Sequence, residues 1–168
     1  METLYYRMKW GWDVALITLL TLVLIFGISI AGFVSGGDGT KGGMVLLLIV
    51  VPVLLCTLLY MPYGMGCSDD GVYVRRVKGT LWIPYDEIQS LSPIDPSDVL
   101  QFRVMGSGGF MGYFGLFRSR KLGNFVLYAT QRKGMVLIET SRKKYVVNCP
   151  DPVAFVECCN RYRRPPKN

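Results

Sequence analysis

The chain has 168 residues, with 19 Lys and Arg against 12 Asp and Glu, and a formal net charge of +7. It contains five Cys and no His, so a Ser or Cys nucleophile lacks its usual base. No CxxC pair is present, which argues against a structural zinc site. From this composition we expect a protein that is not an enzyme and that needs no metal or other cofactor.

Two long apolar segments lie near the start of the chain. Residues 14–34 form a run of 21 without a charged side chain, and residues 44–61 form a second run of 18 that contains Pro52. A bilayer core of about 30 Å needs about 20 apolar residues in a helix, so both runs are long enough to span it. Residues 35–43 between them are polar and rich in glycine, as expected for a loop. We predict a transmembrane helical hairpin at residues 1–63, with spans at residues 14–34 and 44–63.

A cleaved signal peptide is the alternative for the first apolar run. Signal cores usually have about 7–15 apolar residues, and this run is longer and is soon followed by a second. Neither span contains Asp, Glu, Lys or Arg, which favours an anchor over a transport pathway. Basic residues lie outside the two spans at Arg7, Lys9, Arg75, Arg76 and Lys78, with Lys41 alone between the spans. The positive-inside rule therefore predicts a multi-pass inner-membrane protein with both termini in the cytoplasm.

The rest of the chain, residues 64–168, changes from helical to strand periodicity after a short linker at residues 64–71. Alternating apolar residues and turn signals predict seven strands in a single small domain. The predicted strands cover residues 72–74, 81–83, 88–91, 100–105, 125–130, 135–140 and 144–148. Asp151 followed by Pro152 is typical of a helix start and predicts an amphipathic helix that closes the domain.

Three motifs in this region resemble bacterial PH-domain membrane proteins. They are the Gly/aromatic run at residues 106–115, the Tyr-Ala-Thr sequence at residues 128–130 and the Asp-Pro-Val-Ala-Phe sequence at residues 151–155. The resemblance covers roughly residues 63–162, and a short hairpin anchor also fits that group. It implies an α+β membrane protein in which the transmembrane hairpin is followed by a pleckstrin-homology-like (PH-like) seven-stranded antiparallel barrel with a C-terminal capping helix. It also implies a membrane-tethered binding module without catalysis.

Of the 19 basic residues, 16 lie beyond residue 63, and many lie at predicted strand ends. In PH-like barrels the first hairpin loop and the loop between strands six and seven open at the same end. Here these loops carry Arg75, Arg76 and Lys78, and Arg142, Lys143 and Lys144. Together they form a candidate site for an anionic lipid headgroup or an acidic partner segment. We favour the simpler interpretation of a solvated cytoplasmic surface, and nucleic acid is not an expected partner.

The Gly/aromatic run is predicted to be a loop with many large apolar side chains that leads into basic residues. The candidate residues of this loop are Phe110, Met111, Tyr113, Phe114, Phe117, Arg118, Arg120 and Lys121. Its glycines match neither a P-loop nor a dinucleotide fingerprint. We favour packing of the loop on the domain or on the helical hairpin. Insertion into the membrane interface is the second choice, and an oligomer contact remains open.

These features together predict a membrane-anchored PH-like module that docks a protein segment or an anionic lipid headgroup at the cytoplasmic face. The alternative is a structural subunit that assembles with itself or with another membrane protein and has no small ligand. The expected partners are thus membrane lipid and either a membrane protein or a second copy of the chain.

Overall fold

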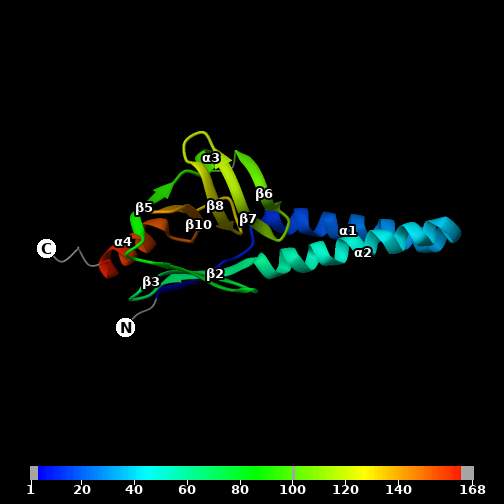
Figure 1. Cartoon of the computed structure of the whole chain (residues 1–168), viewed down its shortest axis with the longest axis horizontal. Coiled ribbons are helices and arrows are strands. Elements are labelled where there is room, and N and C mark those ends of the chain that lie inside the picture. Colours follow the sequence, from blue (N-terminus) through cyan, green and yellow to red (C-terminus); the bar gives the residue numbers. More distant parts are fainter. Residues whose placement is uncertain (1–3, 100, 164–168) are drawn as a thin grey trace.

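The computed structural model describes residues 4–99 and 101–163, and a helical hairpin projects from one end of its β-rich domain (Figure 1). The hairpin consists of α1 (Trp12–Ser35) and α2 (Gly37–Tyr60). Gly36 alone separates the helices, with φ at +66°, so the loop predicted at residues 35–43 is wrong. The glycines of that segment instead allow close helix packing, since a Cβ on Gly39 of α2 would lie 3.0 Å from the carbonyl oxygen of Gly32 of α1.

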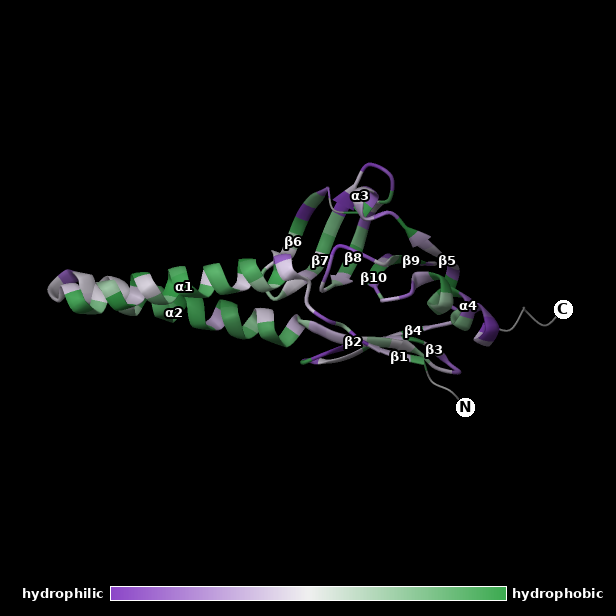
Figure 2. Ribbon diagram, turned by 180° about the vertical axis from the view of Figure 1, so that it is seen from behind, coloured by the Kyte–Doolittle hydropathy of each residue, from purple (hydrophilic) through white to green (hydrophobic). Residues whose placement is uncertain are grey.

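Both helices are long and apolar enough to cross a membrane (Figure 2). Only 17% of the apolar part of α1 and 6% of that of α2 are buried. The hydroxyl groups of Thr18 and Thr57 donate to carbonyl oxygens four residues earlier, so they are satisfied within their own helices. Pro52 lies inside α2, and the helix ends at Tyr60 rather than at residue 63.

A four-stranded antiparallel sheet begins before the hairpin and continues after it. Its strands, in spatial order, are β1 (Leu4–Arg7), β2 (Pro62–Cys67), β3 (Gly71–Arg76) and β4 (Gly79–Pro84). The hairpin is therefore an insertion between two paired strands. The linker predicted at residues 64–71 is wrong for its first half, which belongs to β2, and the sheet crosses the predicted domain boundary after residue 63.

A six-stranded sheet forms the larger part of the domain. Its strands are β5 (Ile88–Ile94), β6 (Phe102–Gly109), β7 (Gly112–Ser119), β8 (Gly123–Ala129), β9 (Met135–Thr140) and β10 (Lys144–Asn148). Their spatial order is β5-β9-β10-β8-β7-β6, and β10 runs parallel to β8. The short helix α3 (Pro96–Val99) connects β5 to β6, and α4 (Pro152–Tyr162) ends the domain.

The prediction of a seven-stranded antiparallel barrel is wrong in three respects. The described residues form ten strands, one strand pair is parallel, and the two sheets do not close into a barrel. Leu100, predicted to begin a strand, lies outside the described residues. The β-rich region with its C-terminal helix is confirmed, and Asp151 caps α4 by accepting a hydrogen bond from the backbone N–H of Ala154 at 3.0 Å.

Both faces of the six-stranded sheet are buried over its central strands, although β6 at one edge is exposed. On one face, Ile138 packs with Met65 and Val74 of the smaller sheet and with Phe155 of α4. The other face carries a second core that includes Phe117, Phe125 and Leu127, together with Val14 from the first turn of α1. The start of the first helix is therefore part of the domain core.

Close backbone contact between β6 and β7 requires glycine at two facing positions. Gly106 and Gly115 are paired across the strands and have φ angles of +120° and +124°. A Cβ on Gly106 would overlap the carbonyl oxygen of Phe114, and one on Gly115 would overlap that of Met105. We expect Gly106→Ala or Gly115→Ala to lower the free energy of unfolding by at least about 2 kcal/mol, in denaturation of the detergent-solubilised chain.

Gly108→Ala is the matched control on the same strand. Its φ is not in the left-handed region, and its added Cβ would meet the flexible end of Arg103 at 3.1 Å. Equal denaturation midpoints for the three variants would show that close contact at Gly106 and Gly115 does not restrict the hairpin.

Candidate functional site

The two sheets hold different helices at the end of the domain from which the hairpin projects. Before α1, the backbone N–H of Gly11 donates to the carbonyl oxygen of Thr130 at 2.8 Å. The hydroxyl of Thr130 donates in turn to the carbonyl oxygen of Lys9 at 2.8 Å. At the end of α2, the backbone N–H of Lys78 donates to the carbonyl oxygen of Leu59 at 2.7 Å. The six-stranded sheet thus holds α1, and the smaller sheet holds α2.

A buried tyrosine adds a polar connection between α1 and the larger sheet. The Tyr113 hydroxyl on β7 donates to Asp13 Oδ2 in the first turn of α1 at 2.7 Å. It accepts a hydrogen bond from Arg132 Nε at 2.7 Å, and Arg132 Nε lies 3.3 Å from the same Asp13 oxygen. Burial and the hydrogen bond to Asp13 raise the pKa of Tyr113, so its hydroxyl stays protonated. This cluster fixes the direction in which α1 leaves the domain.

The first predicted basic group lies at this same end, at the β3–β4 turn. Arg76 pairs with Gly79 across the turn, and Lys78 lies within it. The Lys78 ammonium lies 4.7 Å from the ring centre of Tyr60, the last residue of α2, and donates to its hydroxyl at 2.7 Å. The structure therefore places Arg75, Arg76 and Lys78 beside the base of the hairpin.

Tyrosine rings also position the two arginines. The Arg75 guanidinium lies over Tyr5 of β1 at 5.1 Å and over Tyr73 of β3 at 5.5 Å. Arg76 lies over the Tyr128 ring at 5.4 Å and donates from Nη1 to its hydroxyl at 3.0 Å. Such cation–aromatic contacts orient the side chains without neutralising their charge.

Two further basic residues that sequence reasoning did not include in the site lie at the same end. Arg7, the last residue of β1, pairs with Gly64, which also pairs with Arg75, and Lys9 lies between β1 and α1. We call this set the basic collar: Arg7, Lys9, Arg75, Arg76 and Lys78. Within the described ranges, no carboxylate lies within ion-pair distance of any member of the basic collar.

The second predicted basic group lies elsewhere. Arg142 and Lys143 occupy the β9–β10 turn, where the backbone N–H of Ser141 donates to the carbonyl oxygen of Glu87 at 3.1 Å. Glu87 lies three residues after Pro84. Pro84 pairs with Gly71, and this pair lies at the end of the β3–β4 hairpin that is opposite its turn. The prediction that the two basic loops open at the same end is therefore wrong.

Lys144 of that second group is partly neutralised. Its Nζ lies 2.9 Å from Glu139 Oε1, and the hydroxyl of Ser90 donates to the same carboxylate at 2.6 Å. The hydrogen bond from Ser90, and next that from Lys144, lower the pKa of Glu139. The negative charge of the Glu139 carboxylate makes this part of the surface less attractive to an anion.

The predicted Gly/aromatic loop is a β-hairpin formed by β6 and β7. Its turn, Phe110 and Met111, packs on α1, and the backbone N–H of Met111 donates to Thr18 Oγ1 at 2.9 Å. The remaining candidates of this run, Tyr113, Phe114 and Phe117, are buried in the two cores of the domain.

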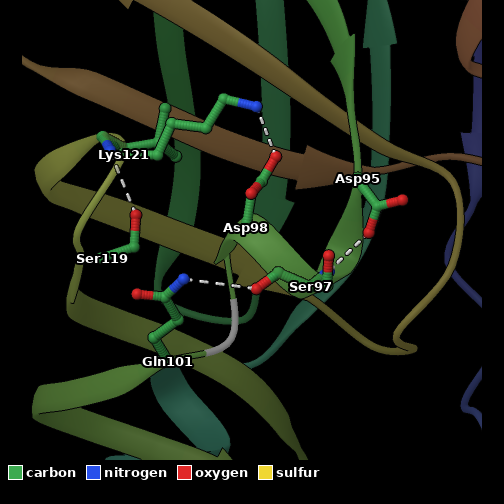
Figure 3. Close-up of polar contacts among 7 residues, drawn as sticks. Asp95, Ser97, Asp98, Gln101, Ser119 and Lys121 are labelled. Carbon is green, nitrogen blue, oxygen red and sulfur yellow. Dashed lines mark hydrogen bonds and ion pairs between the residues drawn. The ribbon is translucent and has the colours of Figure 1, made fainter.

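The basic residues of the run lie at the other end of β7, and Figure 3 shows Lys121 near Ser119, the last residue of that strand. Lys121 Nζ forms an ion pair with Asp98 Oδ2 of α3 at 2.6 Å, and the backbone N–H of Arg120 donates to Gln101 Oε1 at 2.9 Å. Arg118, near the end of β7, is exposed. The length of β7 therefore separates Arg118, Arg120 and Lys121 from the turn that contacts α1.

An exposed apolar surface covers the β6 edge of the larger sheet, the strand nearest to the hairpin in Figures 1 and 2. We call this surface the apolar edge: Phe102, Val104, Met105 and Leu116, with exposed fractions of 60%, 56%, 74% and 37%. The predicted half-buried strand is thus exposed on both faces, because neither the smaller sheet nor α4 covers it. A cavity of about 280 Å³ lies beside it, and its lining includes Arg103 and Arg132.

The comparisons with known proteins give the family of the chain. The family model described as "Bacterial PH domain" matches residues 64–162, more than half of the sequence. The chain belongs to the bacterial PH-domain family. No curated protein and no solved structure matches it. The matched region runs from β2 to the end of α4, so β1 and the helical hairpin lie outside the family match.

Removing one hydroxyl tests the connection between α1 and this PH domain. Tyr113→Phe keeps the ring but loses the hydrogen bonds to Asp13 and from Arg132, so we expect the free energy of unfolding to fall by about 1–2 kcal/mol. Hydrogen exchange at the hydrogen-bonded backbone N–H groups of Gly11 and Ala15 should become faster. Tyr63→Phe is the control, because the exposed Tyr63 hydroxyl has no hydrogen bond in the described part of the chain. Unchanged exchange at Gly11 and Ala15 would contradict this role of Tyr113.

Proposed function

We propose that this bacterial PH-domain protein is a non-catalytic binding module anchored in the inner membrane, and that its basic collar binds anionic lipid headgroups at the cytoplasmic face. The observation that carries the proposal is the position of the basic collar around the base of two exposed apolar helices. Family membership supports a binding module in general, and the position of the charges supports this ligand class.

The helices supply the anchor in this proposal. Each has 24 residues, which corresponds to a length of about 36 Å, enough to span a bilayer core of about 30 Å. Their apolar side chains are mostly exposed, whereas the core helix of a soluble protein would bury one face. A bilayer provides the apolar surroundings that such a surface requires.

The basic collar would then lie at the level of the headgroups. Each basic residue near an anionic bilayer contributes about 1 kcal/mol of attraction. The side chains of Arg75, Arg76 and Lys78 already lie against tyrosine rings, which lowers the entropy that they lose on binding. An excess of basic residues at this end also supports its cytoplasmic location.

The apolar edge supports the same orientation. The β6–β7 turn contacts Thr18, six residues after Trp12, which corresponds to about 9 Å along α1. If the membrane boundary lies near Trp12, this turn reaches the interfacial region, and β6 faces the bilayer beside it. Exposed Phe and Met side chains near basic residues are typical of interfacial contacts.

A second candidate function is assembly with another membrane protein or with a second copy of the chain. The observation that favours it is the unpaired edge of β6, where an added strand could form backbone hydrogen bonds and cover the same apolar side chains.

Headgroup binding can be measured on the full chain in neutral detergent by calorimetric titration with dihexanoyl-phosphatidylglycerol. The double variant Arg75→Gln, Lys78→Gln should lose about 2 kcal/mol of binding free energy, a roughly 30-fold weaker affinity. The control variant Arg142→Gln, Lys143→Gln removes the same charge from the β9–β10 turn and should bind as the unmodified protein does. Equal losses in both variants, or equally tight binding of dihexanoyl-phosphatidylcholine, would exclude the basic collar as a specific anionic site.

The orientation of the domain can be tested with an environment-sensitive fluorophore attached to one introduced cysteine at a time. In these variants Cys56 and Cys158, which are not buried, are replaced by serine. Val104 on β6 and Val153 on α4 are exposed to similar extents, 56% and 59%, but α4 extends toward the end of the domain away from the hairpin (Figure 1). Transfer from detergent to bilayer nanodiscs should shift the emission of a label at Val104→Cys to the blue and leave that at Val153→Cys unchanged. The same emission at both sites in nanodiscs would favour assembly over membrane contact.

A further inference from the structure

Three cysteines from distant parts of the chain meet where α4 packs on the smaller sheet. Cys67 is the last residue of β2, and Cys158 and Cys159 lie on α4. The sulfur atoms of Cys67 and Cys158 are 3.0 Å apart, although 91 positions separate these residues in sequence. Cys67 and Cys159 are buried, whereas Cys158 is partly exposed. One residue of the close pair is therefore partly exposed, and the other is buried.

We propose that Cys67 and Cys158 are a thiol–disulfide site that closes reversibly to an intramolecular disulfide when the protein meets a small-molecule disulfide such as oxidised glutathione. This inference goes beyond headgroup binding and does not rest on it. In a reducing compartment the dithiol is the resting form, and the disulfide is the transient, oxidant-dependent form.

The neighbouring thiol on α4 favours ionisation of the protected cysteine. A hydrogen bond from Cys159 is the main cause that lowers the pKa of Cys67; burial opposes it, and a hydrogen bond from Cys158 adds to it. The hydrogen bond to Cys67, followed by burial, raises the pKa of Cys159, which keeps that thiol protonated as the donor. Because the thiolate is the nucleophile in disulfide exchange, Cys67 is suited to the second step of the reaction.

The reaction balances in two exchange steps. The thiolate of the accessible Cys158 attacks one sulfur of oxidised glutathione, which forms a mixed disulfide and releases one glutathione thiolate. The Cys67 thiolate then attacks the Cys158 sulfur, which forms the intramolecular bond and releases the second glutathione thiolate. The two protons of the cysteine thiols end on the two glutathione molecules, so two thiols are oxidised and one disulfide is reduced.

The crosslink would join the C-terminal helix to the sheet that carries most of the basic collar. It closes a loop that spans 91 positions and therefore restricts the unfolded chain, so the oxidised protein should unfold at a higher temperature than the reduced protein.

The experiment uses the full chain in detergent, with the exposed Cys56 replaced by serine, treated with oxidised glutathione and analysed by intact mass and peptide mapping. This reference protein should lose the mass of two hydrogen atoms, and the crosslink should map to Cys67 and Cys158. Cys67→Ser should stop at a glutathione adduct on Cys158, because the second nucleophile is missing. Cys158→Ser should give neither crosslink nor adduct. Reductant should restore the original mass and melting temperature of the reference protein.

Cys149→Ser and Cys159→Ser are the controls. Cys149 lies in the same core, burial raises its pKa to about 12, and its variant should crosslink as the reference does. Cys159→Ser should still crosslink at the same pair, more slowly because the donor to Cys67 has changed. A reference protein that keeps its free thiols, retains the glutathione adduct or crosslinks a different pair would overturn the proposal. These readouts on the reference protein decide the question even if a serine variant fails to fold.

Discussion

The arrangement of this protein depends on the pairing of β1 with β2 around the base of the helical hairpin. The two strands lie on either side of a 54-residue segment of α1, α2 and short connections, and they are joined by antiparallel pairing between Leu4–Arg7 and residues 64–67. The backbone N–H of Met8 extends this pairing by donating to the carbonyl oxygen of Tyr63 at 3.0 Å. The segment therefore leaves and re-enters the domain at adjacent points. This constraint places the basic collar beside the helices.

The electrostatic asymmetry of the domain follows from that constraint. Away from the hairpin, Lys121 and Lys144 have carboxylate partners at 2.6 and 2.9 Å. Around the hairpin base, Arg75 and Lys78 have tyrosine partners, and within residues 4–99 and 101–163 no carboxylate pairs with them. Exposed ion pairs contribute little to stability. Their main effect is to cancel positive charge at the places on the surface where they form. The positive charges of Arg75 and Lys78 therefore lie unneutralised at the end from which the apolar helices project.

Local sequence patterns predicted the elements that local interactions determine. The two apolar helices, the capped helix α4 and strands β3, β4, β9 and β10 follow from periodicity and turn residues. Strands β2 and β7 were not predicted because glycine is normally depleted in strands. Their glycines are required by close contacts with residues that are distant in sequence or lie on a neighbouring strand. A Cβ on Gly64 would collide with the Tyr5 ring, and Gly106 and Gly115 face each other at close range. The basic collar depends on the same kind of non-local pairing. Sequence spacing alone therefore could not show that Arg75 and Arg142 lie at different ends of the domain.

The smaller sheet connects the two proposed activities through one strand. β2 begins at Pro62, beside the basic collar, and ends at Cys67, beside α4. Its middle is packed tightly, since Gly66 lies under the Tyr73 ring and Met65 is fully buried between the sheets. A disulfide at Cys67 would fix the far end of β2 to α4 without contact with the basic collar. Oxidation should therefore limit the movement of the sheet that carries Arg75 while leaving its charge unchanged, so the proposed redox and lipid-binding activities would be coupled only through the rigidity of β2.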